Sequence, residues 1–387
     1  MSAAAPVLPW WESLPEDYAA HAEGTELDRQ FPWSVRTTAA IDRALRTGLA
    51  LLVTGGLGTA ALRARGFSSD LDKMDFYKPF ADAADPETVF GPPPAVPQAA
   101  LGLRRPISLR HRDIPGRALT FESGFEPLNP DQHASYAAFP ANRTVHTQLW
   151  RHDNGPRKTL LFLHGYSGDF YWFNAAMFSL GWFYKCGYDI ALMTMPFHGP
   201  RAEKRDPYSG YGFFSGGMAQ CNEAMLQAVH DARTLISWLY AEGAPSVGVS
   251  GLSLGGYISA LLAVADDRLA FCIPNSPVVS PVDLGLEWAI TRQLFWALKK
   301  VSNVSVAEMR HGQAVHSPMT YPLKLSPEKV LMIAGAGDRF TPPRYVRALH
   351  NHWPGSRLIW FPGNHLIHLQ QKDYLYEMMG HMDAMTA

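Results

Sequence analysis

The second half of the chain alternates short apolar runs with longer amphipathic segments. Residues 158–163 form an unbroken apolar run, which is typical of a strand buried on both faces. Residues 219–242 repeat apolar positions at helical spacing. Further strands are predicted at 118–126, 143–151, 188–195, 246–250, 269–273, 329–334 and 357–361. Strands that alternate with helices predict an α/β fold, with a mostly parallel central sheet flanked by helices.

The first 97 residues follow a different pattern. Residues 1 to about 90 have helical spacing and few strand signals, and residues 90–97 contain four prolines in eight positions. Such a stretch cannot continue a helix and is typical of a linker. We therefore predict a helical N-terminal extension and linker at 1–97 and an α/β domain at 98–387. Within that domain, residues at about 281–322 break the alternation and are predicted to form a helical cap, with one amphipathic helix at 287–301.

An apolar run at residues 47–62 lies between Arg46 and Arg63. Its 16 residues are fewer than the about 20 that a membrane span needs. We expect a buried or domain-packing helix, and peripheral contact with a membrane surface is the alternative. The first residues lack the pattern of a signal peptide. The expected location is therefore cytoplasmic, with membrane association possible.

Charge and cysteine content exclude several classes of protein. The net charge of −1 gives no basic excess for nucleic-acid binding. Cys186, Cys221 and Cys272 are too few and too scattered for a disulfide framework or a zinc site. No metal or other cofactor is predicted, and the oligomeric state is left open.

The segment Gly251–Gly255 has the spacing G-x-S-x-G, with Ser253 at its centre. A predicted buried strand precedes it and a small-residue helix follows, as expected for a serine held on a sharp strand-to-helix turn. Such a turn exposes the hydroxyl at a helix N-terminus, which favours developing negative charge. Ser253 is therefore predicted to be a nucleophile.

A serine nucleophile needs a base and an acid that orients the base. Asp338 follows the predicted strand at 329–334, and His365 follows the last predicted strand. This order matches the nucleophile, acid, histidine order of hydrolases with this turn. Asp283 is an alternative acid and His368 an alternative histidine.

Two backbone N–H groups are expected to stabilise the oxyanion. One belongs to Leu254, and the other is assigned to Tyr166, in the loop after residues 158–163. His198 and Arg201 follow the strand at 188–195 and are possible substrate contacts, although Arg201 could instead pair with a carboxylate while His198 packs the loop. In the predicted cap, Trp288 and Phe295 could line an apolar acyl pocket or simply pack the cap onto the core.

These motifs make residues 118–385 similar to the α/β-hydrolase superfamily. The segments GYSGDFYWF, GLSLGGYISAL and GDRFTPPRYVRALHNHWPGSRLIWFPGNH resemble the branch of eukaryotic α/β-hydrolase-domain protein eighteen and its bacterial relatives. The resemblance implies a Ser253–His365–Asp338 triad and hydrolysis of an ester-type bond, with a lipid ester as one candidate substrate, and we expect the reaction to pass through an acyl-enzyme. Acyl transfer, amide hydrolysis or carbon–carbon cleavage on the same triad stay open, as does a non-catalytic binding protein on this scaffold.

Overall fold

The structure is a computed structural model that describes residues 8–21, 24–63, 72–106 and 115–387. Its strands are β1 (Ala99–Pro106), β2 (Pro115–Glu122), β3 (Thr144–Trp150), β4 (Thr159–Leu163), β5 (Asp189–Met193), β6 (Val247–Leu252), β7 (Cys272–Asn275), β8 (Leu331–Gly335) and β9 (Arg357–Phe361). They form one sheet in the order β1-β2-β3-β5-β4-β6-β7-β8-β9. Strands β1, β2, β3 and β5 pair antiparallel, and all pairs from β5 to β9 are parallel. The prediction of a mostly parallel central sheet is therefore confirmed.

The predicted strands all have counterparts in this sheet, with ends displaced by a few residues. Strand β1 was not predicted, because residues 98–117 lack a clean alternation of apolar and polar positions. It pairs only with β2 and forms one edge of the sheet, where fewer residues need to be apolar.

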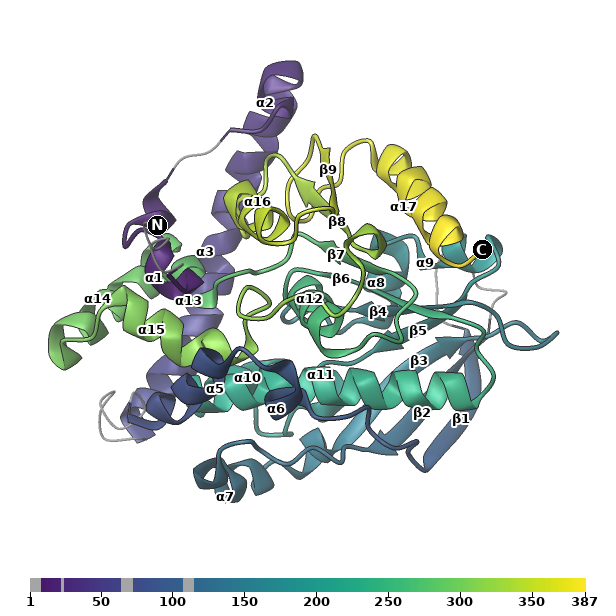
Figure 1. The fold of residues 1–387 in the computed structure, drawn as a ribbon, viewed down its shortest axis with the longest axis horizontal. Helices are drawn as coiled ribbons and strands as arrows, with labels where there is room; N and C mark the ends of the chain where they lie inside the picture. Colours follow the sequence, from purple (N-terminus) through teal and green to yellow (C-terminus); the bar gives the residue numbers. More distant parts are fainter. Residues whose placement is uncertain (1–7, 22–23, 64–71, 107–114) are drawn as a thin grey trace, which may run out of the picture.

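Helices cover both faces of the sheet (Figure 1). In the α/β part they are α7 (His133–Ala137), α8 (Tyr171–Met177), α9 (Leu180–Lys185), α10 (Tyr211–Phe214), α11 (Met218–Ala241), α12 (Leu254–Ala265), α16 (Pro343–His352) and α17 (Gln371–Met385). Strand β4 shows how both faces are buried. Leu161 and Leu163 belong to the core shared with α11 and α12, whereas Leu160 and Phe162 belong to the core shared with α8, α9 and α17.

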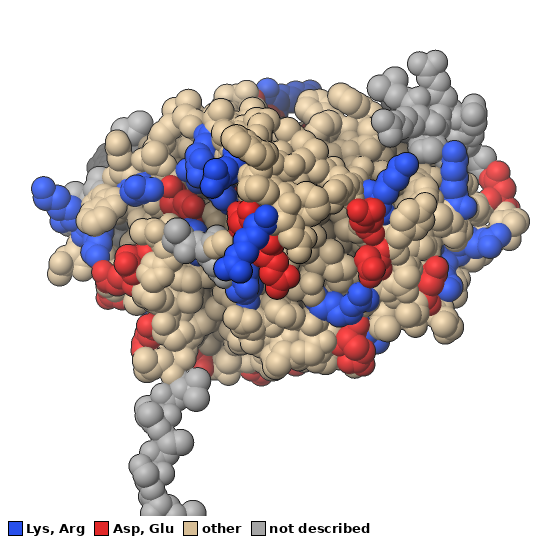
Figure 2. All heavy atoms as spheres, turned by 90° about the horizontal axis from the view of Figure 1, so that it is seen from above, with Lys and Arg blue, Asp and Glu red and all other residues tan. Residues whose placement is uncertain are grey.

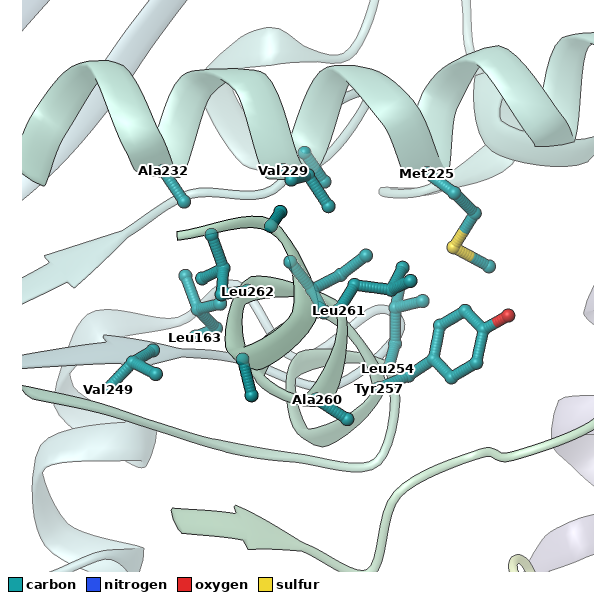
Figure 3. Close-up of a cluster of buried hydrophobic side chains, with 14 of the residues drawn as sticks. Leu163, Met225, Val229, Ala232, Val249, Leu254, Tyr257, Ala260, Leu261 and Leu262 are labelled. Carbon is teal, nitrogen blue, oxygen red and sulfur yellow. The ribbon is translucent and has the colours of Figure 1, made fainter. Parts of the chain in front are cut away.

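The helix that follows Ser253 is buried on all sides. Every residue of α12 is buried. Leu261 and Leu262 lie between α11 and the sheet, close to Val229 and Ala232 of α11 (Figure 3). Burying such aliphatic side chains contributes about 1.5–3 kcal/mol each, so the start of α12 is held firmly in place.

The segment between β7 and β8 contains α13 (Pro281–Glu287), α14 (Ala289–Ser302) and α15 (Val306–Gln313). The single helix predicted at 287–301 corresponds to α14, and α13 ends at Glu287 just before it. The N-terminal region contains α1 (Trp10–Ser13), α2 (Leu27–Gln30), α3 (Pro32–Arg63), α5 (Lys78–Ala83) and α6 (Pro86–Phe90). Helix α3 packs against α14 and α10 (Figure 1).

The apolar run at 47–62 lies within α3. Within this helix, the structure describes the side chains only as far as residue 58. Ala50 and Leu57 are buried, as expected for a packing helix, whereas Leu45 and Leu51 are exposed. In the described part of the chain, no helix combines the length and apolar character of a membrane span. On the face seen in Figure 2, acidic and basic side chains are interspersed.

Candidate active site

Ser253 occupies a strained turn between β6 and α12. Its φ of 58° and ψ of −114° are rare for a residue with a side chain. Its N–H donates to the carbonyl of Asn275 at 2.9 Å. A Cβ on Gly255 would lie 2.0 Å from the carbonyl oxygen of Leu163, so only glycine lets the turn pack this closely against β4. The turn therefore holds Ser253 at the carboxyl edge of the sheet.

Asp338 and His365 meet at the same edge, because β8 and β9 are neighbouring parallel strands. Oδ2 of Asp338 lies 2.7 Å from Nδ1 of His365, and both side chains are buried. Oδ1 of Asp338 accepts the N–H groups of Phe340 and Thr341 at 2.9 and 2.8 Å. The carboxylate accepts at Nδ1, which leaves Nε2 of His365 as the basic nitrogen.

The loop after Asp338 contacts His365 and lines the same cavity as Ser253. Thr341 Oγ1 lies 3.0 Å from the carbonyl of Ser276, just beyond β7, and 3.2 Å from Nδ1 of His365. The His365 ring stacks on Phe340 with centroids 5.0 Å apart. Ser253, Phe340 and Thr341 line one cavity. No hydrogen bond joins the Ser253 hydroxyl to His365 among the described residues, and such contacts often tighten only with substrate.

The charges around His365 favour its protonated form. Burial lowers the pKa of His365, but the charge of Asp338, its hydrogen bond and the charge of Asp42 outweigh burial, so the pKa is raised. This is the direction that a general base in an acyl transfer requires, because the imidazolium forms as the serine loses its proton.

Neither alternative residue, Asp283 as the acid or His368 as the histidine, is placed to form such a pair. Asp283 is buried in an ion pair, with Oδ1 2.6 Å from the guanidinium of Arg310. Nδ1 of His368 lies 2.5 Å from the hydroxyl of Tyr374. Burial lowers the pKa of His368 to about 4. The geometry therefore favours Asp338 and His365 as the acid and the base.

The loop that carries Tyr166 lies beside the serine turn. A Cβ on Gly165 would lie 3.5 Å from Cβ of Ser253. The buried His164 orders this loop, since its Nδ1 lies 2.7 Å from the Gly165 carbonyl and its Nε2 accepts the Met195 N–H at 3.0 Å. Within the described chain, the N–H groups of Tyr166 and Leu254 donate to no protein acceptor. Both are therefore available to an oxyanion.

Two of the four residues that were predicted as possible substrate contacts line the cavity, and the other two do not. Trp288 and Phe295 line the cavity that Ser253 opens into. Arg201 is fully buried and its guanidinium lies 2.7 Å from Asp231, which is the alternative interpretation of this residue. His198 is also fully buried and packs against the ring of Tyr166. Neither His198 nor Arg201 lines this cavity, so the structure gives no support to direct substrate contact by these two residues.

The cavity has a volume of about 100 Å³ and is mostly apolar. The serine turn and the cap supply part of its wall, including Leu254, Leu284, Trp288 and Phe295. The rest includes Leu49, Val53 and Leu57 of α3, which the sequence did not assign to the site. The four-residue spacing of Leu49, Val53 and Leu57 is evident in the sequence, but it does not indicate what α3 packs against.

No known family profile matches the chain. Two uncharacterized proteins of Mycobacterium tuberculosis, from strains CDC 1551 and H37Rv, are each 29% identical over 302 residues, which cover 76% of this chain and 68% of the relative. Among solved structures, acetyl xylan esterase 1 from Thermoanaerobacterium sp. JW/SL YS485 aligns with a TM-score of 0.55 at 17% identity, over 81% of this chain and 94% of that one. The acetyl xylan esterase from Paenibacillus sp. R4 aligns with a TM-score of 0.51 at 16% identity, over 80% and 94%. Together with the sheet order and the serine turn, this likeness shows that the chain has the α/β-hydrolase fold.

Proposed function

We propose that the protein is a serine hydrolase that cleaves carboxylic esters through an acyl-enzyme. The observation that carries this proposal is the 2.7 Å contact of Asp338 with His365, at the sheet edge where the strained turn presents Ser253. A buried carboxylate on Nδ1 fixes the tautomer that a general base needs. Two structural neighbours with a TM-score above 0.5 are acetyl xylan esterases, which adds support from the fold.

In the proposed reaction, Ser253 Oγ attacks the ester carbonyl while Nε2 of His365 takes the hydroxyl proton. The oxyanion accepts hydrogen bonds from the N–H groups of Tyr166 and Leu254, and loss of one such donor typically costs about 3 kcal/mol. The imidazolium, held by Asp338, then protonates the leaving alcohol. Water activated by His365 attacks the acyl-enzyme, and Ser253 leaves with the proton.

The cavity supports a small acyl group. A cavity of about 150 Å³ with apolar walls holds a benzene molecule. The space of about 100 Å³ next to Ser253 is smaller and equally apolar in its walls. We therefore propose esters with acyl chains of a few carbons as the preferred substrates.

The proposal is tested with p-nitrophenyl esters from acetate to palmitate, using the wild type and Ser253→Ala. Turnover in the wild type should be greatest for short chains and should fall by at least about 10³-fold in the variant. A serine-directed phosphonate should label the wild type only. If the wild type neither turns over an ester nor takes the label, the hydrolase proposal is wrong. Labelling without ester turnover would reject the ester class and keep the nucleophile.

A further inference from the structure

Helix α3 contributes a buried carboxylate directly behind the catalytic pair. Asp42 lies on the inner face of α3 and is fully buried. Its Oδ2 accepts the backbone N–H of His365 at 3.1 Å and that of Arg339, the residue after Asp338, at 2.9 Å. One oxygen atom therefore bridges the two loops that carry the acid and the base.

Other contacts hold α3 in this position. The side-chain amide of Asn364 donates to the carbonyl of Thr38 at 2.7 Å, and the guanidinium of Arg46 donates to the carbonyl of Arg339 at 2.9 Å. A Cβ on Gly337 would lie 2.5 Å from Thr38 Oγ1, so the loop before Asp338 touches the helix without room for a side chain. The site and the extension are packed as one unit.

We propose that Asp42 is a positioning residue, supplied by the extension, that fixes the distance between Asp338 and His365. This inference rests on the proposed function. The two loops follow different strands, and in the described chain direct backbone hydrogen bonds join them only before their tips, as from the Gly337 N–H to the Gly363 carbonyl at 2.7 Å. The acceptor shared by the N–H groups of Arg339 and His365 joins the tips, and small misplacements of catalytic groups are costly in rate.

Asp42 also acts on the charge of the pair. The charged groups that act on Asp42 are Asp338 and His365 from the catalytic loops, and the Asp42 carboxylate in turn acts on the Arg339 guanidinium. Burial and the charge of Asp338 raise the pKa of Asp42 to about 7, and the Asp42 charge in turn raises the pKa of His365. Oδ1 of Asp42 is buried and has no hydrogen-bond partner in the described residues. A proton can therefore occupy Oδ1 while Oδ2 keeps both N–H donors.

Two variants separate the acceptor from the charge. Asp42→Asn keeps an oxygen for the two N–H groups and removes the charge, whereas Asp42→Leu removes both and keeps the branching at Cγ. We expect the Asn variant to keep kcat within about 3-fold and to shift the acidic limb of kcat/KM to lower pH. The Leu variant should lose about 10–100-fold in kcat with little change in KM. Thr47→Val, on the exposed face of the same helix, is the matched control.

The pKa of the His365 ring, followed by NMR titration in the wild type and Asp42→Asn, gives a measurement that needs no turnover. A lower His365 pKa in the Asn variant supports the effect of the Asp42 charge on the pair, and an unchanged one overturns that effect. A folded Leu variant with wild-type kcat would overturn the positioning role. If Asp42→Leu fails to fold, a folded Asn variant that loses about 10-fold or more in kcat would overturn it instead, because this variant keeps the shared acceptor. If the ring pKa moves but the wild type hydrolyses no ester and takes no phosphonate, the proposed function fails separately from the placement of Asp42.

Discussion

The serine turn and helix α3 both form the site, but they are held there by different means. The turn is a short sequence motif: Gly251 and Gly255 lie so close to each other and to Leu163 of the neighbouring strand β4 that neither position has room for a Cβ. Helix α3 acts at long range, since Asp42 and His365 are 323 residues apart in the chain. A nucleophile can therefore be predicted from a short sequence motif. A residue that positions the catalytic loops can come from any segment that packs against those loops, so no motif predicts it.

The largest change in kcat/KM is expected when the two candidate acids, Asp338 and Asp283, are replaced in turn. Asp338→Asn should lower kcat/KM by about 10⁴-fold, because the amide no longer stabilises the imidazolium or the correct tautomer. Asp283→Asn should instead leave kcat/KM within about 10-fold and lower the free energy of unfolding by about 3 kcal/mol, because Arg310 is left buried without its full partner. Ester kinetics and urea unfolding measure the two quantities.

Asp82→Asn is the control for that comparison, because Asp82 pairs with His311 at an exposed position and should change stability by less than about 1 kcal/mol. If folded Asp283→Asn lost as much activity as Asp338→Asn, the choice of acid would be reversed.

A smaller effect is expected at the pocket wall, which the extension and the cap share. Val53→Phe in α3 should fill the cavity and lower kcat/KM for butyrate by about 10–100-fold, with less effect on acetate. Phe295→Ala in the cap should move the preference toward longer chains. The chain-length profile of p-nitrophenyl esters measures both, and Leu51→Phe on the exposed face of α3 is the control. Equal behaviour of Val53→Phe and wild type would exclude α3 from the acyl pocket.

The charge of Asp42 predicts a pH dependence of stability. Its pKa is raised from 3.8 to about 7, so the folded protein binds this proton more tightly than the unfolded chain. The resulting stabilisation is complete below about pH 4 and is lost as the pH rises through about 7. The free energy of unfolding of Asp42→Asn, relative to the wild type, should therefore rise between pH 5 and pH 8. Parallel stability curves across this range would contradict the raised pKa.

The smallest effect on catalysis concerns the exposed face of α3, where membrane contact stays a prediction. Leu45 and Leu51 are 48% and 58% exposed, and Arg36 and Arg43 are exposed elsewhere on the same helix. Exposed apolar and basic side chains on one helix suit contact with the surface of an anionic bilayer. In flotation with phosphatidylserine vesicles, the double variant Leu45→Glu/Leu51→Glu should bind about 10-fold less than the wild type and hydrolyse soluble esters within about 2-fold of it. Tyr376→Glu on α17 is the control, and a wild type that does not float would contradict membrane contact by α3.

The sequence alone predicted the features that depend on local chemistry. Buried strands appear in the sequence as apolar runs because both faces of a parallel sheet are covered. Ser253 and Asp338 follow two such strands, β6 and β8, and His365 follows the partly exposed edge strand β9. The order of the strands in the sheet could not be predicted from the sequence. Parallel strands nevertheless place their carboxyl ends at one edge of the sheet, whatever their order. This is why three residues spread over more than a hundred positions could be grouped before the structure was seen.

Tertiary structure decided the rest. His198 and Arg201 have residue types suited to a substrate, yet the Arg201–Asp231 pair and the ring of Tyr166 show that they support the loops from behind. The role of Asp42 could not be predicted from the sequence, because a single aspartate in a helix belongs to no motif and to no periodic pattern. Its place depends on how α3 docks against the loops after β8 and β9, and docking is set by surface shape and buried area over the whole interface.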